Sequence, residues 1–437
     1  MERLYSILEI MKIKDIVRFH SETTMPIPDV VYHLYSLPSF DNNQTREELL
    51  GQDIQSNKFT VPNRCILFNK LNVRFKRIWR IDSDEDHKIA STEFLPLIID
   101  ENKVDFAYCF YLLASPAITD YLCGQNANTS GSHKRIDPTN FFNIGIKLPP
   151  LAQQYEIGKL LSSLDAKIKL NRQINQNLEA MAKQLYDYWF MQFDFPNEEG
   201  KPYKSSGGEM VWNEKLKREI PKEWEVLNLG QITTSYQQGL IRSNNQLSDS
   251  SEFGYLKMGD LDGKGQYSLQ KLARTNATSE EVFLFSLHKG DFLINVRNSK
   301  EIVGKTCLID YVEENTLFNH MLVRMSFDKV TSFYMNLLFN TDFMYRAMDG
   351  LKQGTTTVIA LYQEDLYRLP IVVPTKNVMD TFSIIEKSIL NQKELLTNEI
   401  ISLIKQRDEL LPLLMNGQVS VNSDLAVSYI IYKDINI

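Results

Sequence analysis

Two segments of the chain carry an apolar repeat whose steps alternate between four and three residues. Such a repeat is the heptad pattern of helices that pack as a coiled coil. Each helical segment spans about 40 residues, hence roughly 60 Å of helix. The repeat positions are Ile157, Leu161, Leu164, Ile168, Asn171, Asn175, Leu178, Ala182, Leu185 and Trp189 in the first segment, and Val378, Phe382, Ile385, Ile389, Gln392, Leu396, Glu399, Leu403, Gln406 and Leu410 in the second.

The first repeat contains two asparagines, Asn171 and Asn175, at positions that a partner helix would cover. An amide buried without a hydrogen-bond partner is costly, so we expect polar groups opposite them. Gln392 and Gln406 in the second repeat are the expected partners. The pattern therefore favours pairing of the two helices with each other. Separate packing of each helix against its own domain remains the alternative, because a heptad repeat alone does not exclude it.

The segments that precede the two helices also repeat, in the same order. Each half offers a turn before an apolar strand, an aromatic-rich helix, a loop rich in small polar residues, and a strand that ends in proline. The first half reads VPNRCILFNKL, FAYCFYLLASPAITDYL and GQNANTSGSHKRIDPTNFFNIGIKLPP. The second half reads LHKGDFLINVR, FYMNLLFNTDFMYRAM and GLKQGTTTVIALYQEDLYRLPIVVP. The sequence thus predicts a tandem of domain and helix, then domain and helix.

Chain length agrees with this organisation, because 437 residues exceed what a single core usually supports. A crossing segment rich in Gly, Pro, Ser and charge separates the halves. The predicted parts are a first domain at 1–150, a long helix at 151–195, a crossing segment at 196–225, a second domain at 226–375, a second long helix at 376–416, and an unassigned tail at 417–437.

The charge of the chain is uneven. The net charge of −7 argues against a nucleic-acid partner, but residues 64–80 contain six basic residues and no acidic one. From charge alone, DNA contact and a solvated basic face explain this run equally well. Its basic residues are Arg64, Lys70, Arg74, Lys76, Arg77 and Arg80.

Motifs for catalysis or metal binding are not found in the sequence. The four cysteines and six histidines show no spacing typical of metal ligands. Neither an N-P-P-Y tetrapeptide that would hold a flipped adenine nor a G-x-x-x-x-G-K-[ST] loop occurs. No apolar run approaches the length of a membrane span. We therefore expect a cytoplasmic protein that performs recognition and leaves chemistry to its partners.

The end of the first long helix is unusually aromatic. Residues of this kind are enriched at the cores of protein interfaces, so we expect a partner-binding surface here. Internal packing under a recognition domain is the alternative, and both uses are compatible. The predicted partner-binding residues are Tyr186, Trp189, Phe190 and Phe193.

Taken together, the tandem order and three stretches of sequence resemble the DNA-specificity (S) subunit of Type I restriction-modification enzymes. The stretches are LPPLAQQYEIGKLLSSLDAKIKLNRQINQNLEAMAKQLYDYWFMQFDF, GGEMVWNEKLKREIPKEWEV and QRDELLPLLMNGQV. The resemblance covers nearly the whole chain. One departure is that the first domain lacks the I-P-x-x-W lead that the second shows at Ile220, Pro221 and Trp224.

This resemblance implies an α+β fold. Two similar mixed α/β target-recognition domains would be separated by two long antiparallel coiled-coil helices, and each domain would read half of a split site on double-stranded DNA. The helices would also dock two methyltransferase subunits, and restriction subunits would join that core. S-adenosylmethionine, ATP and Mg would then belong to the partner subunits, with no cofactor in this chain.

Candidate DNA contacts lie in the loops of both predicted domains. Small residues let the backbone approach DNA, and amides, hydroxyls and cations address base edges and phosphates. An ordinary polar turn is the alternative for each loop. Besides the basic residues Arg64, Lys70, Arg74, Lys76 and Arg77, the candidates are Asn128, Ser130, His133, Lys134 and Arg135 in the first half, and Asn295, Arg297, Asn298, Lys300, Gln353, Thr355 and Thr356 in the second.

Two functions of different classes follow. The favoured one is a non-catalytic, sequence-specific DNA-binding subunit that directs a methyltransferase and restriction complex to a bipartite target with a non-specific spacer. The alternative is a coiled-coil scaffold whose globular domains bind proteins, for which the overall acidity is the best argument.

Overall fold

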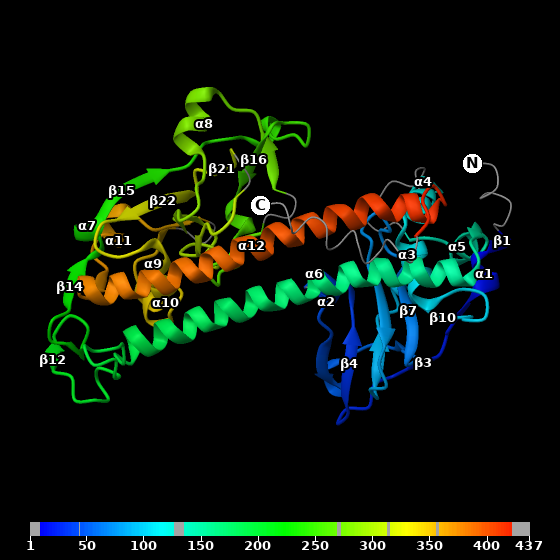
Figure 1. Ribbon diagram of the computed structural model, residues 1–437, viewed down its shortest axis with the longest axis horizontal. Coiled ribbons are helices and arrows are strands. Elements are labelled where there is room, and N and C mark those ends of the chain that lie inside the picture. Colours follow the sequence, from blue (N-terminus) through cyan, green and yellow to red (C-terminus); the bar gives the residue numbers. More distant parts are fainter. Residues whose placement is uncertain are drawn as a thin grey trace. The chain divides into compact units, whose positions relative to one another are not determined.

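The computed structural model describes residues 9–42, 44–125, 135–268, 272–312, 315–354 and 358–421. The chain divides into two compact units (Figure 1). Unit 1 comprises Met1–Leu170 and Ile400–Ile437, and unit 2 comprises Asn171–Glu399. Both long helices cross this division, so each contributes one part to each unit.

The globular part of unit 1 contains two sheets and a short strand pair. The four-stranded sheet has the order β2-β10-β7-β8, the five-stranded sheet has the order β3-β6-β9-β4-β5, and β1 pairs with β11. The strands are β1 (Glu9–Lys12), β2 (Val17–Phe19), β3 (Thr23–Thr24), β4 (Val31–Tyr35), β5 (Glu47–Leu50), β6 (Lys58–Thr60), β7 (Arg64–Asn69), β8 (Ile78–Asp82), β9 (Lys88–Ala90), β10 (Phe94–Ile99) and β11 (Gly145–Leu148). The helices are α1 (Ile13–Ile16), α2 (Leu37–Asp41), α3 (Phe106–Ala114), α4 (Pro116–Gln125) and α5 (Pro138–Phe142).

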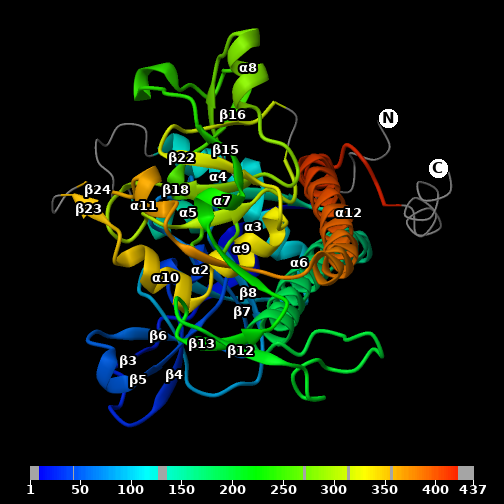
Figure 2. The same ribbon diagram turned by 90° about the vertical axis from the view of Figure 1, so that its left-hand side faces the viewer.

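Unit 2 contains a second set of sheets (Figure 2). The orders are β15-β22-β18-β20, β17-β16-β21 and β19-β24-β23, with the pairs β12-β13 and β14-β25. The strands are β12 (Met210–Asn213), β13 (Arg218–Pro221), β14 (Glu225–Asn228), β15 (Thr233–Gln238), β16 (Phe253–Leu256), β17 (Ala273–Thr275), β18 (Phe292–Asn295), β19 (Arg297–Asn298), β20 (Thr306–Leu308), β21 (Leu317–Phe318), β22 (Leu322–Phe327), β23 (Gln353–Gly354), β24 (Ile359–Ala360) and β25 (Pro370–Val373). The helices are α7 (Leu229–Ile232), α8 (Ser279–Phe285), α9 (Ser332–Phe339), α10 (Asp342–Asp349) and α11 (Gln363–Leu366).

The predicted repeat is confirmed by the strand orders. The sheet β2-β10-β7-β8 of unit 1 corresponds strand by strand to β15-β22-β18-β20 of unit 2, and the pair β1-β11 corresponds to β14-β25. The aromatic helix that follows starts in both units with a side chain that accepts a hydrogen bond from a backbone N–H. Asp105 accepts from Tyr108 in α3 at 2.8 Å, and Thr331 accepts from Tyr334 in α9 at 3.1 Å. The two halves thus share this four-stranded sheet, the strand pair and the aromatic helix, while their remaining sheets differ.

The two predicted long helices are α6 (Leu151–Tyr186) and α12 (Lys376–Met415). Within unit 1, Leu164 and Ile168 of α6 share an apolar cluster with Leu403 of α12. Within unit 2 the contacts run in reverse order along the two helices: Asn171 meets Glu399, and Trp189 meets Phe382. The helices therefore pair with each other and are antiparallel, as the heptad pattern favoured.

The expected partners of the two asparagines were wrong. Asn171 Nδ2 donates a hydrogen bond of 2.7 Å to Glu399 Oε2, and Gln406 donates to Ser402 on its own helix. Asn175 Oδ1 is buried without a hydrogen bond. The heptad pattern located these polar positions, but Glu399, one heptad away from each expected glutamine, supplies the partner of Asn171.

The aromatic end of the first helix is the core of unit 2. Beyond Tyr186 the chain makes a π turn at Asp187–Met191, in which Trp189 and Phe190 are buried. Phe190 lies 4.8 Å from both Tyr334 and Phe382, measured between ring centroids, and Phe193 lies 5.4 Å from Trp224. The predicted partner-binding residues Tyr186, Trp189, Phe190 and Phe193 are at most 5% exposed. That prediction needs correction, because a partner cannot contact rings that the fold itself covers.

One carboxyl group on α12 is buried at a cost. Burial raises the pKa of Glu386 to about 6 from its ordinary 4.5, and its Oε2 has no hydrogen bond. The folded state therefore holds the proton more tightly than the unfolded state. Stability falls as the pH rises from 4.5 to about 6, and the loss is complete above that range.

Glu386→Gln is accordingly expected to stabilise the protein at pH 7.5 by about 1–2 kcal/mol and to have little effect at pH 4. Thermal unfolding of the full chain at both pH values measures the difference. Glu409→Gln, at an exposed position of the same helix, is the matched control and should change neither value. An equal gain from Glu386→Gln at both pH values would contradict the assignment.

Candidate nucleic-acid interface and partner surface

The ends of β15 and β18 and the start of β22 lie together at one edge of the sheet β15-β22-β18-β20 of unit 2. The strand β15 ends there with Gln238, which pairs with Val323 near the start of β22. The strand β18 ends there with Asn295, which pairs with Leu322. The loops that leave this edge therefore emerge side by side although they are distant in sequence.

Two of the segments predicted to contact DNA join in one small sheet of order β19-β24-β23. Two strands of this sheet, β23 and β24, are labelled in Figure 2. Arg297 in β19 and Gln353 in β23 both pair with Ala360 in the central strand β24. Lys352 Nζ further donates a hydrogen bond of 3.1 Å to the carbonyl of Lys300. The sequence predicted the two segments separately, and the structure makes them parts of one surface.

A glycine is required where β23 ends. Gly354 has a φ of +142°, and a Cβ atom at this position would lie 2.2 Å from the carbonyl oxygen of Val358. Only glycine fits so close an approach of two strands. This geometry fixes the ends of the loop that contains Thr355 and Thr356, which themselves lie outside the described residues.

The cations of this surface differ in availability. Arg297 and Lys300 are exposed, and neither forms an ion pair within the described part of the chain. Asn298 is partly exposed, and its Oδ1 accepts a hydrogen bond from the N–H of Ser299. Gln353 donates a hydrogen bond of 2.8 Å from Nε2 to Asp365. This bond does not use the side-chain carbonyl oxygen of Gln353, which can still accept one. The two free cations can meet phosphates, and the amides can address base edges.

Asn295 does not belong to this surface. It is fully buried, and its Oδ1 accepts a hydrogen bond of 3.1 Å from the N–H of Arg297. Asn69 ends β7 in unit 1 in the same way and accepts from the N–H of Leu71 at 2.9 Å. Asparagine favours such turns because its side chain replaces a backbone acceptor. Burial therefore argues against the predicted DNA contact of Asn295 and gives it the role of ending the strand.

Unit 1 carries the corresponding edge. Leu71 forms an isolated bridge with Arg135, and Ile136 N–H donates a hydrogen bond of 2.9 Å to the carbonyl of Lys70. The segment after β7 and the end of the loop before α5 are thus neighbours, as β19 and β24 are in unit 2. Of that loop, Asn128, Ser130, His133 and Lys134 lie outside the described residues.

Carboxylates from elsewhere in the chain compensate part of the basic run at 64–80. Arg64 pairs with Glu101 at 2.7 Å and also with Asp82, and Arg77 pairs with Asp41 at 2.6 Å. Arg135, which forms the bridge with Leu71, pairs with Glu93, and this hydrogen bond raises the pKa of the guanidinium. Among described residues, Lys70, Arg74 and Lys76 form no ion pair. Arg80 of β8 also lacks an ion pair there, but it donates a hydrogen bond of 3.0 Å to the Ser162 hydroxyl. The positive charge left uncompensated therefore lies in the turn between β7 and β8 and on Arg80.

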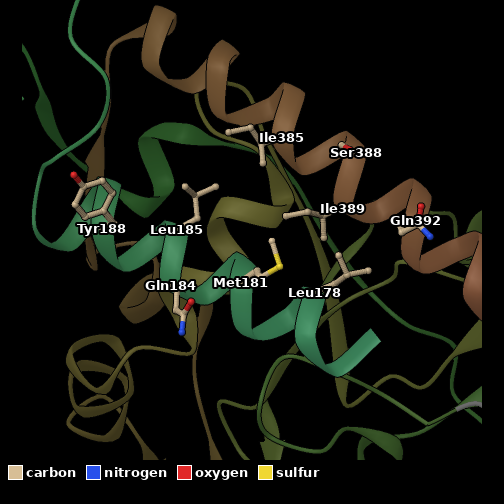
Figure 3. Close-up of a pocket in the computed structure, with 9 residues that line it drawn as sticks. All are labelled: Leu178, Met181, Gln184, Leu185, Tyr188, Ile385, Ser388, Ile389 and Gln392. Atoms are coloured by element: carbon tan, nitrogen blue, oxygen red, sulfur yellow. The ribbon is translucent and has the colours of Figure 1, made fainter. Parts of the chain in front are cut away.

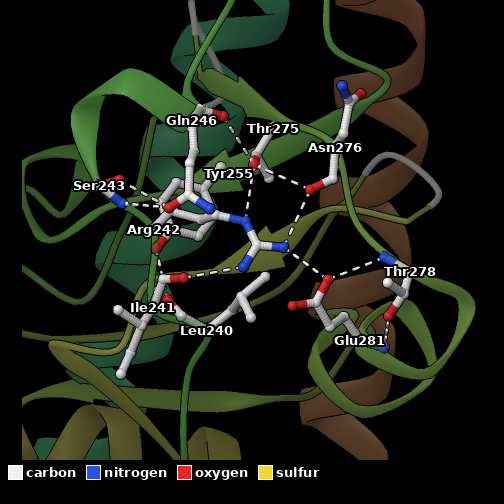
Figure 4. Close-up of polar contacts among 10 residues, drawn as sticks. All are labelled: Leu240, Ile241, Arg242, Ser243, Gln246, Tyr255, Thr275, Asn276, Thr278 and Glu281. Atoms are coloured by element: carbon white, nitrogen blue, oxygen red, sulfur yellow. Dashed lines mark hydrogen bonds and ion pairs between the residues drawn. The ribbon is translucent and has the colours of Figure 1, made fainter.

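One cation that sequence reasoning passed over is structural (Figure 4). Arg242, only 10% exposed, donates to Glu281 at 2.7 Å, to the carbonyl of Asn276 and to the hydroxyl of Thr275. The hydrogen bond from Arg242 holds the pKa of the Glu281 carboxyl below its usual range. Arg242 thereby fixes the loop after β15 to α8 and β17, and it is not free to bind a phosphate.

An apolar groove lies between α6 and α12 within unit 2 (Figure 3). Met181 is 57% exposed and Tyr188 39% exposed, in contrast to the buried rings next to them in sequence. Sequence reasoning missed this groove because it selected the aromatic residues that point inward. The lining residues are Leu178, Met181, Gln184, Leu185, Tyr188, Ile385, Ser388, Ile389 and Gln392.

Neither a metal site nor a membrane span was found in the described ranges. No group of three or more His, Cys, Asp or Glu side chains there is arranged to hold a metal ion. None of the helices there combines the length and apolar character that crossing a membrane requires. All four cysteines are free thiols.

Comparison with known proteins identifies the family. The sequence model of the family described as "Type I restriction modification DNA specificity domain" matches residues 8–180 and 221–407. The two matches cover most of the chain, one for each half of the structural repeat. The chain belongs to this family of Type I restriction-modification specificity subunits, whose role is recognition of DNA sequence.

Individual relatives agree with this assignment. The chain is 24% identical over 340 residues to the specificity subunit of the Type I restriction enzyme MjaIX from Methanocaldococcus jannaschii, which covers 74% of this chain and 71% of that one. It is 32% identical over 129 residues to the specificity subunit of the enzyme HindI from Haemophilus influenzae, covering 30% and 28%. The crystal structure of the S subunit from M. genitalium has a TM-score of 0.53 at 14% identity, covering 94% of this chain and 96% of that chain, and thus shares the fold.

Proposed function

We propose that this chain is the subunit that reads a bipartite DNA target, each globular domain contacting one half. The observation that carries the proposal is the sheet edge found twice, once in each unit, with uncompensated and mostly exposed cations beside loops of small polar residues. Arg297 and Lys300 serve the second domain, and Lys70, Arg74 and Lys76 serve the first. Cations position a protein on DNA, and the adjoining amides and hydroxyls discriminate bases.

The methyltransferase is the proposed partner of the helix pair. The groove between α6 and α12 offers exposed apolar side chains flanked by Gln184 and Gln392, the composition expected of an interface core with a polar rim. Two methyltransferase subunits, one for each half of the repeat, and additional restriction subunits would complete the assembly. S-adenosylmethionine, ATP and Mg would be bound by those partners, and this chain would remain non-catalytic.

A scaffold that binds only proteins is not favoured. The overall acidity was its best argument, but the two matches to the specificity-domain family, one in each half of the chain, support DNA recognition instead. The salt dependence of DNA binding separates the two functions, because a protein that neutralises phosphates releases counterions and a scaffold releases none.

Arg297→Gln combined with Lys300→Gln is expected to weaken DNA binding by the complex reconstituted with the methyltransferase. The slope of log K against log salt should become shallower by about 2, since each phosphate that is no longer neutralised reduces the slope by about 0.9. Lys215→Gln combined with Lys217→Gln removes the same charge from the exposed hairpin β12-β13 and is the matched control. Fluorescence anisotropy with a duplex over a range of salt concentrations gives both slopes.

Two results would contradict the proposal. A slope near zero for the unaltered complex would favour the scaffold. Equal reductions in affinity for the Arg297/Lys300 variant and for the control variant would mean that overall charge, and not this sheet edge, meets the DNA.

A further inference from the structure

A lysine is buried between the two long helices and the second recognition domain. Lys393 lies on α12, and its side chain is 7% exposed. Its Nζ is 2.6 Å from Asp310 Oδ2 and 2.9 Å from Glu179 Oε1, and it donates a longer hydrogen bond of 3.3 Å to Gln266 Oε1. One ammonium group therefore contacts three segments that are far apart in sequence.

These three acceptors belong to separate elements of unit 2. Glu179 is on α6, Asp310 follows β20, and Gln266 belongs to the turn that leads to Tyr267. The Tyr267 hydroxyl donates to Asp310 Oδ1 at 3.3 Å and accepts from the N–H of Tyr311 at 3.0 Å. Lys393 is therefore connected through Asp310 to a hydrogen-bond network inside the recognition domain, formed by Tyr267 and Tyr311.

Stability alone does not explain this arrangement. Burial lowers the pKa of Lys393, and the two carboxylates more than offset that effect, so the pKa is raised and the lysine stays charged. Taking the Lys393 ammonium and the Asp310 carboxylate out of water is costly, and apolar residues of similar volume usually stabilise a core at least as well. A buried charge cluster instead favours one arrangement of its partners, because the attraction between the charges offsets the cost of desolvation only when all of them are in place.

Unit 1 contains a cluster that connects the same kinds of elements. Asp165 of α6 accepts from Arg407 of α12 at 2.8 Å and from the Tyr111 hydroxyl of α3 at 2.6 Å. In unit 2 the position that corresponds to Asp165 is Glu386, since each follows an equivalent heptad residue, Leu164 or Ile385. Glu386 forms no ion pair in the described part of the chain, and the charged cluster lies one heptad further on, at Lys393.

We propose that Lys393 is a positioning residue that holds the second recognition domain in one orientation on the helix pair, and thereby restricts the spacer length that the complex accepts. This inference rests on the proposed function, since spacer length has meaning only for a bipartite reader. Lys393 acts through Glu179, Asp310 and Gln266 and does not touch DNA.

The test compares a neutral cluster with the natural one in the full chain. Lys393→Met alone leaves two carboxylates unpaired and risks unfolding, so the decisive variant combines Lys393→Met with Glu179→Gln and Asp310→Asn. Lys393→Arg keeps the charge, so its hydrogen exchange and its spacer preference should match those of the unaltered chain. Lys289→Met is the matched control, because Lys289 pairs with Glu394 and joins the same domain to the same helix at a more exposed site.

Two readouts are needed. Hydrogen exchange of residues 259–268 in the full chain reports the attachment without DNA, and the triple variant should exchange faster there. Methylation by the reconstituted complex is then measured on duplexes with the natural spacer and with spacers one base pair longer or shorter. The preference for the natural spacer should fall by about tenfold in the triple variant, since a displacement of about 1 Å is enough to change such rates.

A folded triple variant with unchanged exchange at 259–268 would overturn the proposal, as would unchanged spacer preference despite faster exchange. A complex whose unaltered form methylates without regard to spacer would refute the bipartite function instead, and the exchange measurement would still report on the attachment. If Lys289→Met reduced the preference for the natural spacer as much as the triple variant does, loss of any ion pair between this domain and α12 would be enough to cause the effect. That result would overturn the role of Lys393.

Discussion

Phe190→Ala is expected to destabilise unit 2 by about 3–5 kcal/mol, the usual cost of removing a buried phenyl ring. The ring is 3% exposed and lies 4.8 Å from both Tyr334 and Phe382, between ring centroids. Its removal would leave a cavity at the point where α6, α9 and α12 meet. Urea unfolding of the full chain, followed by tryptophan fluorescence, measures the change.

Tyr188→Ala is the matched control, two residues away on the exposed side of the same turn. It should change stability by less than about 1 kcal/mol and weaken co-purification with the methyltransferase instead, because Tyr188 lines the groove. The opposite result would be a Phe190→Ala variant that is as stable as the unaltered chain but does not co-purify with the methyltransferase. That result would support the original prediction that these rings bind the partner.

Lengthening both long helices is expected to change the spacer of the target and not its two halves. Seven residues inserted after Asn175 in α6 and after Leu396 in α12 preserve the heptad phase and add about 10 Å of rise to each helix. Asn171 would still face Glu399, and Glu179 would still face Lys393, because each pair lies on one side of the insertions. The spacer should lengthen by about one to three base pairs, at 3.4 Å each.

Sequencing of methylated sites in cells that carry the lengthened chain measures the spacer. Insertion into α6 alone is the control, and it should reduce methylation because the two heptad repeats are then out of register. Altered half-site sequences, or an unchanged spacer in an active enzyme, would defeat the idea that the helices set the separation.

The repeat and the paired helices were predictable because both depend on local periodicity. A heptad pattern needs only the order of apolar residues, and the tandem order needs only a comparison of the chain with itself. The partner of Asn171 was not predictable to the residue. Glu399 and Gln392 lie seven residues apart in the same repeat, and only the register of the two helices distinguishes them.

Side-chain availability could not be predicted from the sequence. Arg77 looks like Arg74 in a run without acidic residues, yet Asp41, distant along the chain, neutralises it. The aromatic end of α6 has the composition of an interface and of a core alike, and only the fold shows that Phe190 points inward while Tyr188 does not. Asn295 was misassigned for the same reason, since a polar residue at the end of a strand can face either DNA or its own turn.

The most direct test of the central claim is the map of methylated sites made by the unaltered chain with its methyltransferase. The account predicts one motif composed of two short specific blocks around a spacer of fixed length. Arg297→Gln with Lys300→Gln should weaken methylation of that motif, and Lys215→Gln with Lys217→Gln should not. A single contiguous motif, or methylation that does not depend on this chain, would contradict the account.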